Sequence, residues 1–424
     1  MSSPVMSLGM RHDGEDERIL WLFNEGTSCF RDRAASVSAF TADVIGAARK
    51  FHSTIPGYEP TPLRSLKNLA SFLGVKAVYV KDESYRFGLN SFKVLGASYS
   101  IARFLAERLG RDISELPYDV MTSPEVKRAL GDVTFAATTD GNHGRAVAWT
   151  GRMLRQNVVV YMPKGSSKQR FDAIAGEGAS VAIRDVNYDE SVRLTADEAE
   201  EKGWIVVQDT AWPGYEDIPL WTMQGYGTSA SEAVEQLRAG GASDPTHVFI
   251  QAGVGSLAGM VQGFFSANFP ENSPKVVVAE ASRADCYYRS ALVGDGMPHN
   301  VTGDLDSIMA GLACGEPNSI AFGILRDHAS AFVSCPDYVT ARGMRVLGNP
   351  LAGDESVCSG ESGAVTTGLL TFIMRDDALK ALRDSLKLDR NSTVLLFSTE
   401  GDTDEAHYRS IVWDGEFPTF KCRA

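Results

Sequence analysis

The chain has 424 residues, of which 44% are hydrophobic and 22% are charged, a composition typical of folded globular proteins. This composition excludes collagen-like, disordered and coiled-coil proteins. Because 41 Lys and Arg residues stand against 54 Asp and Glu residues, the formal net charge is −13, and we expect no nucleic-acid partner. At roughly 100–200 residues per domain, the length indicates two or three domains.

The N-terminal segment, residues 1–18, contains several charged residues and lacks the apolar core of a signal peptide. The uncharged segment 248–265 contains four glycines, and we interpret it as a buried strand, loop and helix instead of a membrane span. The sequence therefore predicts a cytoplasmic protein with no membrane partner.

Short apolar runs alternate with helical patterns along most of the chain. The runs that we expect to form strands cover residues 77–80, 134–137, 158–162, 181–183, 204–207, 247–251, 275–279 and 393–397. The segments that we expect to form helices cover residues 91–109, 142–154, 168–175, 189–201, 226–237 and 257–265. Strands separated by helices are typical of parallel sheets that are covered on both faces.

We therefore predict an α/β protein with two lobes, each a mainly parallel sheet covered by helices. The larger lobe is expected to combine residues 1–114 with residues 231–424. The smaller lobe is expected to span residues 115–230.

A glycine-rich segment, Gly253-Val254-Gly255-Ser256-Leu257-Ala258-Gly259, lies between an expected strand and an expected helix. Glycines let the backbone approach a ligand, and the N–H groups at a helix start attract an anion. The segment lacks the Gly-Lys-Ser/Thr ending of a P-loop, and its glycine spacing departs by one residue from the dinucleotide pattern. We favour a phosphate site. Two alternatives stay open: a dinucleotide site, in which Glu280 would bind the ribose, and a turn that binds no ligand.

A polar turn, Thr138-Thr139-Asp140-Gly141-Asn142-His143-Gly144-Arg145, follows another expected strand. Open parallel sheets bind ligands at the carboxyl ends of their strands, so this turn is a second candidate site. The alternative is an ordinary Asp-Gly turn in which Asn142 caps the following helix. His143 has no second His or Cys at ligand spacing, so we expect no metal site.

Lys93 falls in the first turn of an expected helix. The positive end of the helix dipole disfavours a protonated amine there, which predicts a lowered pKa for Lys93. A free amine is what a Schiff base with an aldehyde requires. A solvated surface lysine is the ordinary alternative.

The segment Ser398-Thr399-Glu400-Gly401-Asp402-Thr403-Asp404 follows an apolar strand. Its hydroxyl groups could meet a ring nitrogen of a cofactor, while a solvated acidic loop is the alternative. Together, the lysine, the glycine-rich turn, Asn142 and these hydroxyl groups suit pyridoxal 5′-phosphate, which offers an aldehyde, a phosphate, a phenolic oxygen and a pyridine nitrogen. A nicotinamide cofactor would not explain Lys93.

The chain resembles the fold-type II pyridoxal-phosphate enzymes, the tryptophan synthase β-like family, and within it the diaminopropionate ammonia-lyases. The segments that carry the resemblance are residues 88–93, 138–144, 160–165, 208–212, 223–226, 251–255, 309–317, 359–364 and 398–403. They span nearly the whole chain beyond about residue 55.

The resemblance implies a role for each cofactor-binding residue. Lys93 would form the Schiff base, Asn142 would face the phenolic oxygen, and Ser398 or Thr399 would meet the ring nitrogen. The phosphate would be held by Gly253, Val254, Gly255 and Ser256. A neutral hydroxyl at the ring nitrogen would favour β-elimination.

The resemblance also implies an activity, the α,β-elimination of D- or L-2,3-diaminopropionate to pyruvate and two ammonia by a homodimer. Lys93 would remove the Cα proton on one face of the substrate and Asp140 on the other. Asp140 stands where serine and threonine dehydratases of this fold usually carry a serine, and its carboxylate suits a second amine. The residues expected to bind substrate are Thr138, Thr139, Asp140, His143, Tyr188 and Asp209. A serine or threonine dehydratase-type lyase and a β-replacement synthase of the same fold are the alternatives.

Overall fold

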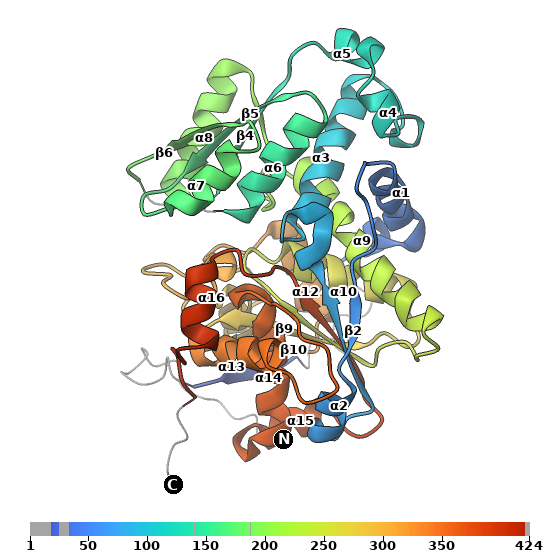
Figure 1. The fold of residues 1–424 in the computed structure, drawn as a ribbon, viewed down its shortest axis with the longest axis vertical. Helices are drawn as coiled ribbons and strands as arrows, with labels where there is room; N and C mark the ends of the chain where they lie inside the picture. The colour runs from blue at the N-terminus through green and yellow to red at the C-terminus, as the bar shows by residue number, and fades with distance from the viewer. Residues whose placement is uncertain (1–17, 25–33, 140, 187, 420–424) are drawn as a thin grey trace.

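The computed structural model describes residues 18–24, 34–139, 141–186 and 188–419. Two separate sheets organise these residues, and helices cover each of them (Figure 1). This architecture confirms the predicted α/β class.

The smaller sheet has the strand order β6-β5-β4-β7, and all its neighbouring strands are parallel. Its strands are β4 (Thr134–Thr138), β5 (Asn157–Met162), β6 (Ser180–Ile183) and β7 (Ile205–Val206). Its crossover helices are α6 (Asn142–Met153), α7 (Lys168–Ala175) and α8 (Tyr188–Lys202). All seven elements lie within two residues of the predicted ranges.

The larger sheet has the strand order β1-β10-β9-β8-β11-β3-β2. Its strands are β1 (Leu20–Phe23), β2 (Leu63–Ser65), β3 (Ala77–Asp82), β8 (His247–Gln251), β9 (Lys275–Ala281), β10 (Ala331–Cys335) and β11 (Thr393–Ser398). The inner strands are parallel, while β1 and β2 run antiparallel at the two edges. Strands β8, β10 and β11 are buried along their whole length. Burial on both faces explains why most inner strands read as continuous apolar runs.

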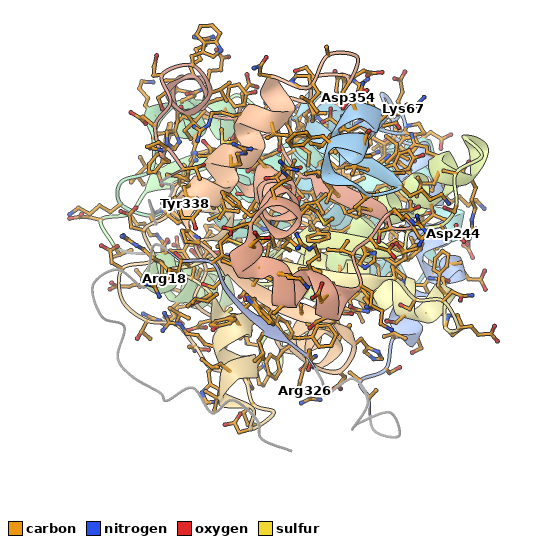
Figure 2. The ribbon with its side chains drawn as sticks, turned by 90° about the horizontal axis from the view of Figure 1, so that it is seen from below. Arg18, Lys67, Asp244, Arg326, Tyr338 and Asp354 are labelled. Carbon is orange, nitrogen blue, oxygen red and sulfur yellow. The ribbon has the colours of Figure 1, made fainter. Side chains whose placement is uncertain are left out.

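The other α-helices pack around the larger sheet or join it to the smaller one. They are α1 (Ala42–Ser53), α2 (Lys67–Leu73), α3 (Lys93–Arg108), α4 (Tyr118–Met121), α5 (Pro124–Leu130), α9 (Asp217–Ala239), α10 (Ser256–Asn268), α11 (Cys286–Val293), α12 (Ser319–His328), α13 (Asp337–Gly348), α14 (Glu361–Arg375), α15 (Lys380–Leu386) and α16 (Glu405–Val412). Figure 2 shows charged side chains such as Lys67 and Asp244 at the rim of the molecule. Within the described ranges, we find no helix that combines the length and the apolar character needed to cross a membrane.

Helix α9 begins nine residues before the predicted start at residue 226. Pro219 is its third residue, where a missing N–H costs no intrahelical hydrogen bond, so the proline does not delay the helix. Helix α9 crosses α3 closely, since a Cβ on Gly225 would lie 2.3 Å from the Leu95 carbonyl oxygen. The predicted lobe boundary between residues 230 and 231 falls inside this helix.

Candidate active site

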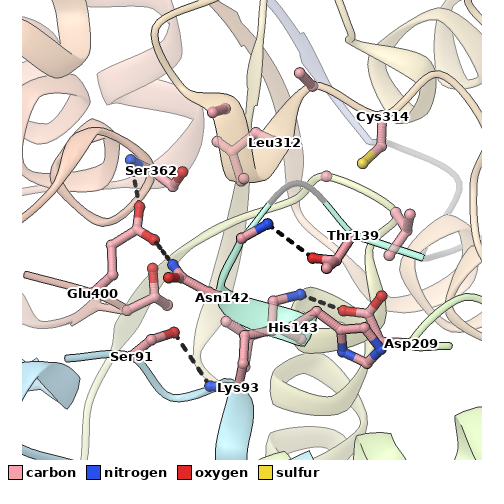
Figure 3. Close-up of a pocket in the computed structure, with 18 of the residues that line it drawn as sticks. Ser91, Lys93, Thr139, Asn142, His143, Asp209, Leu312, Cys314, Ser362 and Glu400 are labelled. Atoms are coloured by element: carbon pink, nitrogen blue, oxygen red, sulfur yellow. Dashed lines mark hydrogen bonds and ion pairs between the residues drawn. The ribbon is translucent and has the colours of Figure 1, made fainter. Parts of the chain in front are cut away.

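A cavity of about 240 Å³ lies where turns from both sheets converge (Figure 3). The turn after β4, the turn after β8 and the turn after β11 line it, together with Lys93 at the start of α3. All three turns follow the carboxyl ends of parallel strands, where α/β sheets bind their ligands. The candidate segments predicted from the sequence therefore line one cavity.

Lys93 is the first residue of α3, and its ammonium forms an ion pair with the Asp209 carboxylate. Its Nζ lies 5.3 Å from the centre of the Phe92 ring and 5.9 Å from that of the Tyr226 ring. The Phe92 N–H donates to the Thr399 carbonyl at 3.0 Å, which fixes the helix start against the end of β11.

The predicted lowering of the Lys93 pKa is wrong for this ion pair. Burial of Lys93 does lower its pKa, but the Asp209 carboxylate outweighs burial, and the pKa lies above its usual value. Burial would likewise raise the pKa of Asp209, but the Lys93 ammonium holds it well below its usual range. The helix dipole, worth roughly 0.3–1 kcal/mol, is weaker than this contact.

Asp209 connects the lysine to the glycine-rich turn. Its carboxylate also accepts a hydrogen bond from the Tyr226 hydroxyl at 3.3 Å, and its backbone carbonyl accepts one from the Ser256 hydroxyl. The Ser256 hydroxyl in turn accepts from the Asn318 side-chain amide at 2.8 Å. Asp209 is thus held on two sides at the cavity wall.

The glycine-rich turn joins β8 to α10. Gly255 has a φ of +94°, and a Cβ at this position would lie 2.0 Å from the Tyr287 hydroxyl. A Cβ on Gly253 would lie 2.9 Å from the Gly311 carbonyl oxygen. Both positions therefore require glycine, and the first turn of α10 offers N–H groups that need an outside acceptor. The turn fits a phosphate.

The two threonines of the polar turn line the cavity, but their hydroxyl groups have partners within the protein. The Thr138 hydroxyl lies 2.7 Å from the Thr195 hydroxyl, inside the smaller sheet's helical layer. The Thr139 hydroxyl accepts from the Gly141 N–H at 3.0 Å. Asp140, the expected second base, lies outside the described residues.

Asn142 and His143 begin helix α6 at the cavity wall. The Asn142 side-chain amide donates to the Glu400 carboxylate at 2.5 Å. His143 Nε2 contacts the Val207 carbonyl oxygen at 2.8 Å, and among the described residues no partner reaches its Nδ1. Burial lowers the pKa of His143, which disfavours its protonated form.

Ser398 and Thr399, whose hydroxyl groups are the candidates to meet the ring nitrogen of the cofactor, differ in their position at the end of β11. Thr399 lines the cavity and its hydroxyl accepts from the Gln251 side-chain amide at 2.7 Å. Ser398 is buried beside the cavity without lining it, and its hydroxyl lies 3.4 Å from the Glu400 carbonyl oxygen. Tyr188, at the start of α8, does line the cavity.

Glu400, for which the sequence predicted no role, also lines the cavity. Its carboxylate accepts from Asn142 and, at 3.2 Å, from the Ser362 backbone N–H. Burial and the nearby Glu361 carboxylate raise the pKa of Glu400 to about 7. The only feature of the sequence that could have indicated a role for Glu400 is its position two residues after the buried strand β11.

Comparisons with known proteins agree with this geometry. Residues 54–398 match the family described as pyridoxal-phosphate dependent enzyme. The diaminopropionate ammonia-lyase of Escherichia coli K12 is 52% identical over 378 residues, which cover 89% of this chain and 93% of that protein. The enzyme of the same name from Salmonella typhimurium is 48% identical over 382 residues, which cover 90% and 95%.

A solved structure of the Escherichia coli enzyme, in complex with an aminoacrylate-PLP azomethine reaction intermediate, superposes with a TM-score of 0.85 at 47% identity. The match covers 94% of this chain and 98% of that one. The cofactor and the family that the sequence predicted are confirmed. The chain belongs to the pyridoxal-phosphate-dependent enzymes, and within them to the diaminopropionate ammonia-lyase family.

Proposed function

We propose that the protein is a carbon–nitrogen lyase that converts D- or L-2,3-diaminopropionate to pyruvate and two ammonia. The observation that carries this proposal is the ion pair of Lys93 with Asp209, set between the anion-binding turn of α10 and Asn142. The relatives named above are diaminopropionate ammonia-lyases, which supports the choice of substrate.

The residues of the cavity fit pyridoxal phosphate, which, when bound, supplies an electron sink that acidifies the Cα proton of an amino acid. Lys93 would hold the aldehyde carbon, and the backbone of residues 253–256 would hold the phosphate. Asn142 would donate to the phenolic oxygen. Thr399 is better placed than Ser398 to meet the ring nitrogen, because only Thr399 lines the cavity.

Lys93, released by the incoming substrate amine, removes the Cα proton on its own face of the substrate. Asp140 removes it on the opposite face, which would let both enantiomers react. The electron pair of the C–H bond becomes the Cα–Cβ double bond, and the β-nitrogen leaves as ammonia with the pair of the broken C–N bond. Water then converts the released 2-aminoacrylate to pyruvate and the second ammonia. A positioned base of this kind contributes on the order of 10²–10⁴-fold in rate.

The remaining cavity residues would bind and orient the substrate. Thr138, Thr139, His143, Tyr188 and Asp209 all line the cavity, which supports this assignment. We also infer that the sheets belong to two lobes, divided near residue 114 and near residue 230, where the second division falls within α9. We infer further that the protein acts in the cytoplasm as a homodimer.

The test follows pyruvate release by the purified holoenzyme from D- and L-2,3-diaminopropionate, with serine and threonine as controls. Lys93→Ala should lose nearly all activity, and Asp140→Asn should slow one enantiomer more than the other. Faster release from serine or threonine would indicate a dehydratase. A new amino acid in place of pyruvate would indicate a β-replacement synthase.

A further inference from the structure

Three carboxylates of the described residues line the cavity, and two of them have a cationic partner. Asp209 is paired with the Lys93 ammonium, and Glu361 lies 2.8 Å from the His407 imidazole. Glu400 forms no ion pair with any lysine, arginine or histidine that the structure describes. Its two hydrogen-bond donors, Asn142 and the Ser362 N–H, are neutral.

A carboxylate offers about four acceptor positions, and these donors occupy two of them. Glu400 is 8% exposed, so water cannot replace the missing partners fully. The nearby Glu361 carboxylate also disfavours the charged form of Glu400. A cation beside Glu400 would offset both this repulsion and the cost of burying the charge. Arg170, whose charge acts in the opposite direction, lines the cavity without a described ion pair to Glu400.

The Ser362 hydroxyl, beside Glu400 in the cavity, lacks a hydrogen-bond partner among the described residues. Ser362 is 4% exposed. Ser362 lines the cavity beside Glu400, as Figure 3 shows. A buried hydroxyl without a partner is uncommon in folded proteins, and a ligand with N–H donors would satisfy it.

We propose that Glu400, with the Ser362 hydroxyl beside it, binds the β-ammonium of the substrate and so selects a diamino acid over serine. This inference rests on the proposed function. Serine and threonine carry no second ammonium, whereas 2,3-diaminopropionate carries one. This ammonium matches the single cavity carboxylate that forms no ion pair among the described residues.

The same contact supports the chemistry. Two ammonium groups on adjacent carbons repel each other, which favours loss of a proton from one of them. The β-nitrogen leaves as neutral ammonia only if it is protonated when the C–N bond breaks, since the nitrogen takes the bonding pair. A carboxylate at this position keeps the proton on the β-nitrogen until the bond breaks.

The test compares two substrates in the holoenzyme. One is 2,3-diaminopropionate and the other is 2-amino-3-chloropropionate, which has the same carbon skeleton but loses chloride and needs no proton. For Glu400→Gln, the ratio of kcat/KM for the diamino acid to kcat/KM for the chloro acid should fall about 10- to 100-fold, the size expected for a hydrogen-bonded charge. Glu400→Asp, which keeps the charge, should recover part of this ratio.

Glu361→Gln is the matched control, because it removes the same charge from the same cavity but from a carboxylate that has His407. Its ratio should not fall, because loss of the Glu361 charge favours the charged form of Glu400. An equal fall for both substrates in Glu400→Gln, or an equal change of the ratio in Glu361→Gln, would refute the role of Glu400. Wild-type protein that acts on the chloro acid but not on the diamino acid would instead refute the proposed function, and the inference with it. Cofactor titration of each variant, followed by absorbance, separates these results from a loss of cofactor.

Discussion

A buried ionic cluster supports the segment that leads to Lys93. It consists of Lys81 on β3, Glu83 and Arg86 in the 3-10 helix that follows, and Glu232 on α9. Glu232 accepts from the Lys81 ammonium at 2.7 Å and from the two terminal nitrogens of Arg86 at 2.9 and 2.7 Å. All four side chains are at most 1% exposed. The cluster holds two positive and two negative charges.

We expect Glu232→Gln to destabilise the protein by about 3–5 kcal/mol, since it leaves two buried cations against one carboxylate. Burial already lowers the pKa of Lys81, and the Glu232 carboxylate opposes that effect. Loss of this carboxylate would therefore lower the pKa of Lys81 further and favour its neutral form.

The assay is denaturant unfolding of the purified protein, followed by far-ultraviolet circular dichroism. Glu235→Gln is the control, because Glu235 lies on the same helix and pairs with Arg49 while its side chain is 61% exposed. An exposed pair contributes about 0–1 kcal/mol, so this control should stay within that range. A loss below about 1 kcal/mol for Glu232→Gln, or equal losses for both variants, would refute the reasoning.

Three further predictions concern the cavity. Gly255→Ala should weaken cofactor binding at least tenfold in an absorbance titration, because its Cβ would meet the Tyr287 hydroxyl at 2.0 Å and its φ is +94°. Asp209→Asn should let the cofactor-free protein take up pyridoxal phosphate at lower pH, since burial then lowers the pKa of Lys93 against only the smaller opposing effects of Cys314 and Glu400. Glu400, whose pKa is about 7, becomes protonated as the pH falls through 7, so kcat/KM for 2,3-diaminopropionate should fall there in the wild type and fall less in Glu400→Gln.

Each of these predictions has its own control. Gly46→Ala places a Cβ in α1 with no atom within 4 Å, so cofactor affinity should not change. An unchanged pH dependence of cofactor uptake in Asp209→Asn would show that Asp209 does not set the pKa of Lys93. The substrate amines titrate equally in both proteins, so identical pH profiles for the wild type and Glu400→Gln would contradict the ionisation of Glu400.

The parallel strands could be predicted from the sequence because burial on both faces leaves a continuous apolar run. Strand β8 has the predicted bounds, and β11 extends one residue beyond them. The antiparallel edge strand β2 gives no such signal, since its three residues include Arg64 and are only partly buried. The parallel strand β10 was not predicted, because Ser334 interrupts its apolar run. The Ser334 hydroxyl donates a hydrogen bond to the buried Asp285 carboxylate.

The cavity turns could be predicted one by one, but not how their side chains pair. The ion pair of Lys93 with Asp209 joins residues 116 positions apart, and no local pattern encodes it. Because the sequence does not reveal this ion pair, the pKa of Lys93 was predicted in the wrong direction. Glu400 fits a solvated acidic loop equally well until the structure shows that it is buried. Burial and pairing are properties of the assembled fold.

Backbone contacts beyond the end of β11 fix the spacing between Lys93, the proposed base, and Glu400, the proposed ammonium-binding carboxylate. Ser91 and Glu400 form an antiparallel bridge, flanked by hydrogen bonds from the Phe92 N–H to the Thr399 carbonyl and from the Gly401 N–H to the Asn90 carbonyl, at 3.0 and 3.1 Å. Lys93 and Glu400 therefore project from one rigid backbone unit.

Elimination needs such a unit, because the Cα proton and the β-nitrogen sit on adjacent carbons and must meet their partners together. Asn142, in contrast, comes from the smaller sheet and reaches Glu400 through a single side-chain contact. A movement between the two sheets that preserves the bridge of Ser91 with Glu400 would alter the contact of Asn142 with Glu400 and leave the spacing of Lys93 and Glu400 intact. In the proposed mechanism, selection of the leaving group and removal of the proton would thus depend on the same bridged backbone between Ser91 and Glu400.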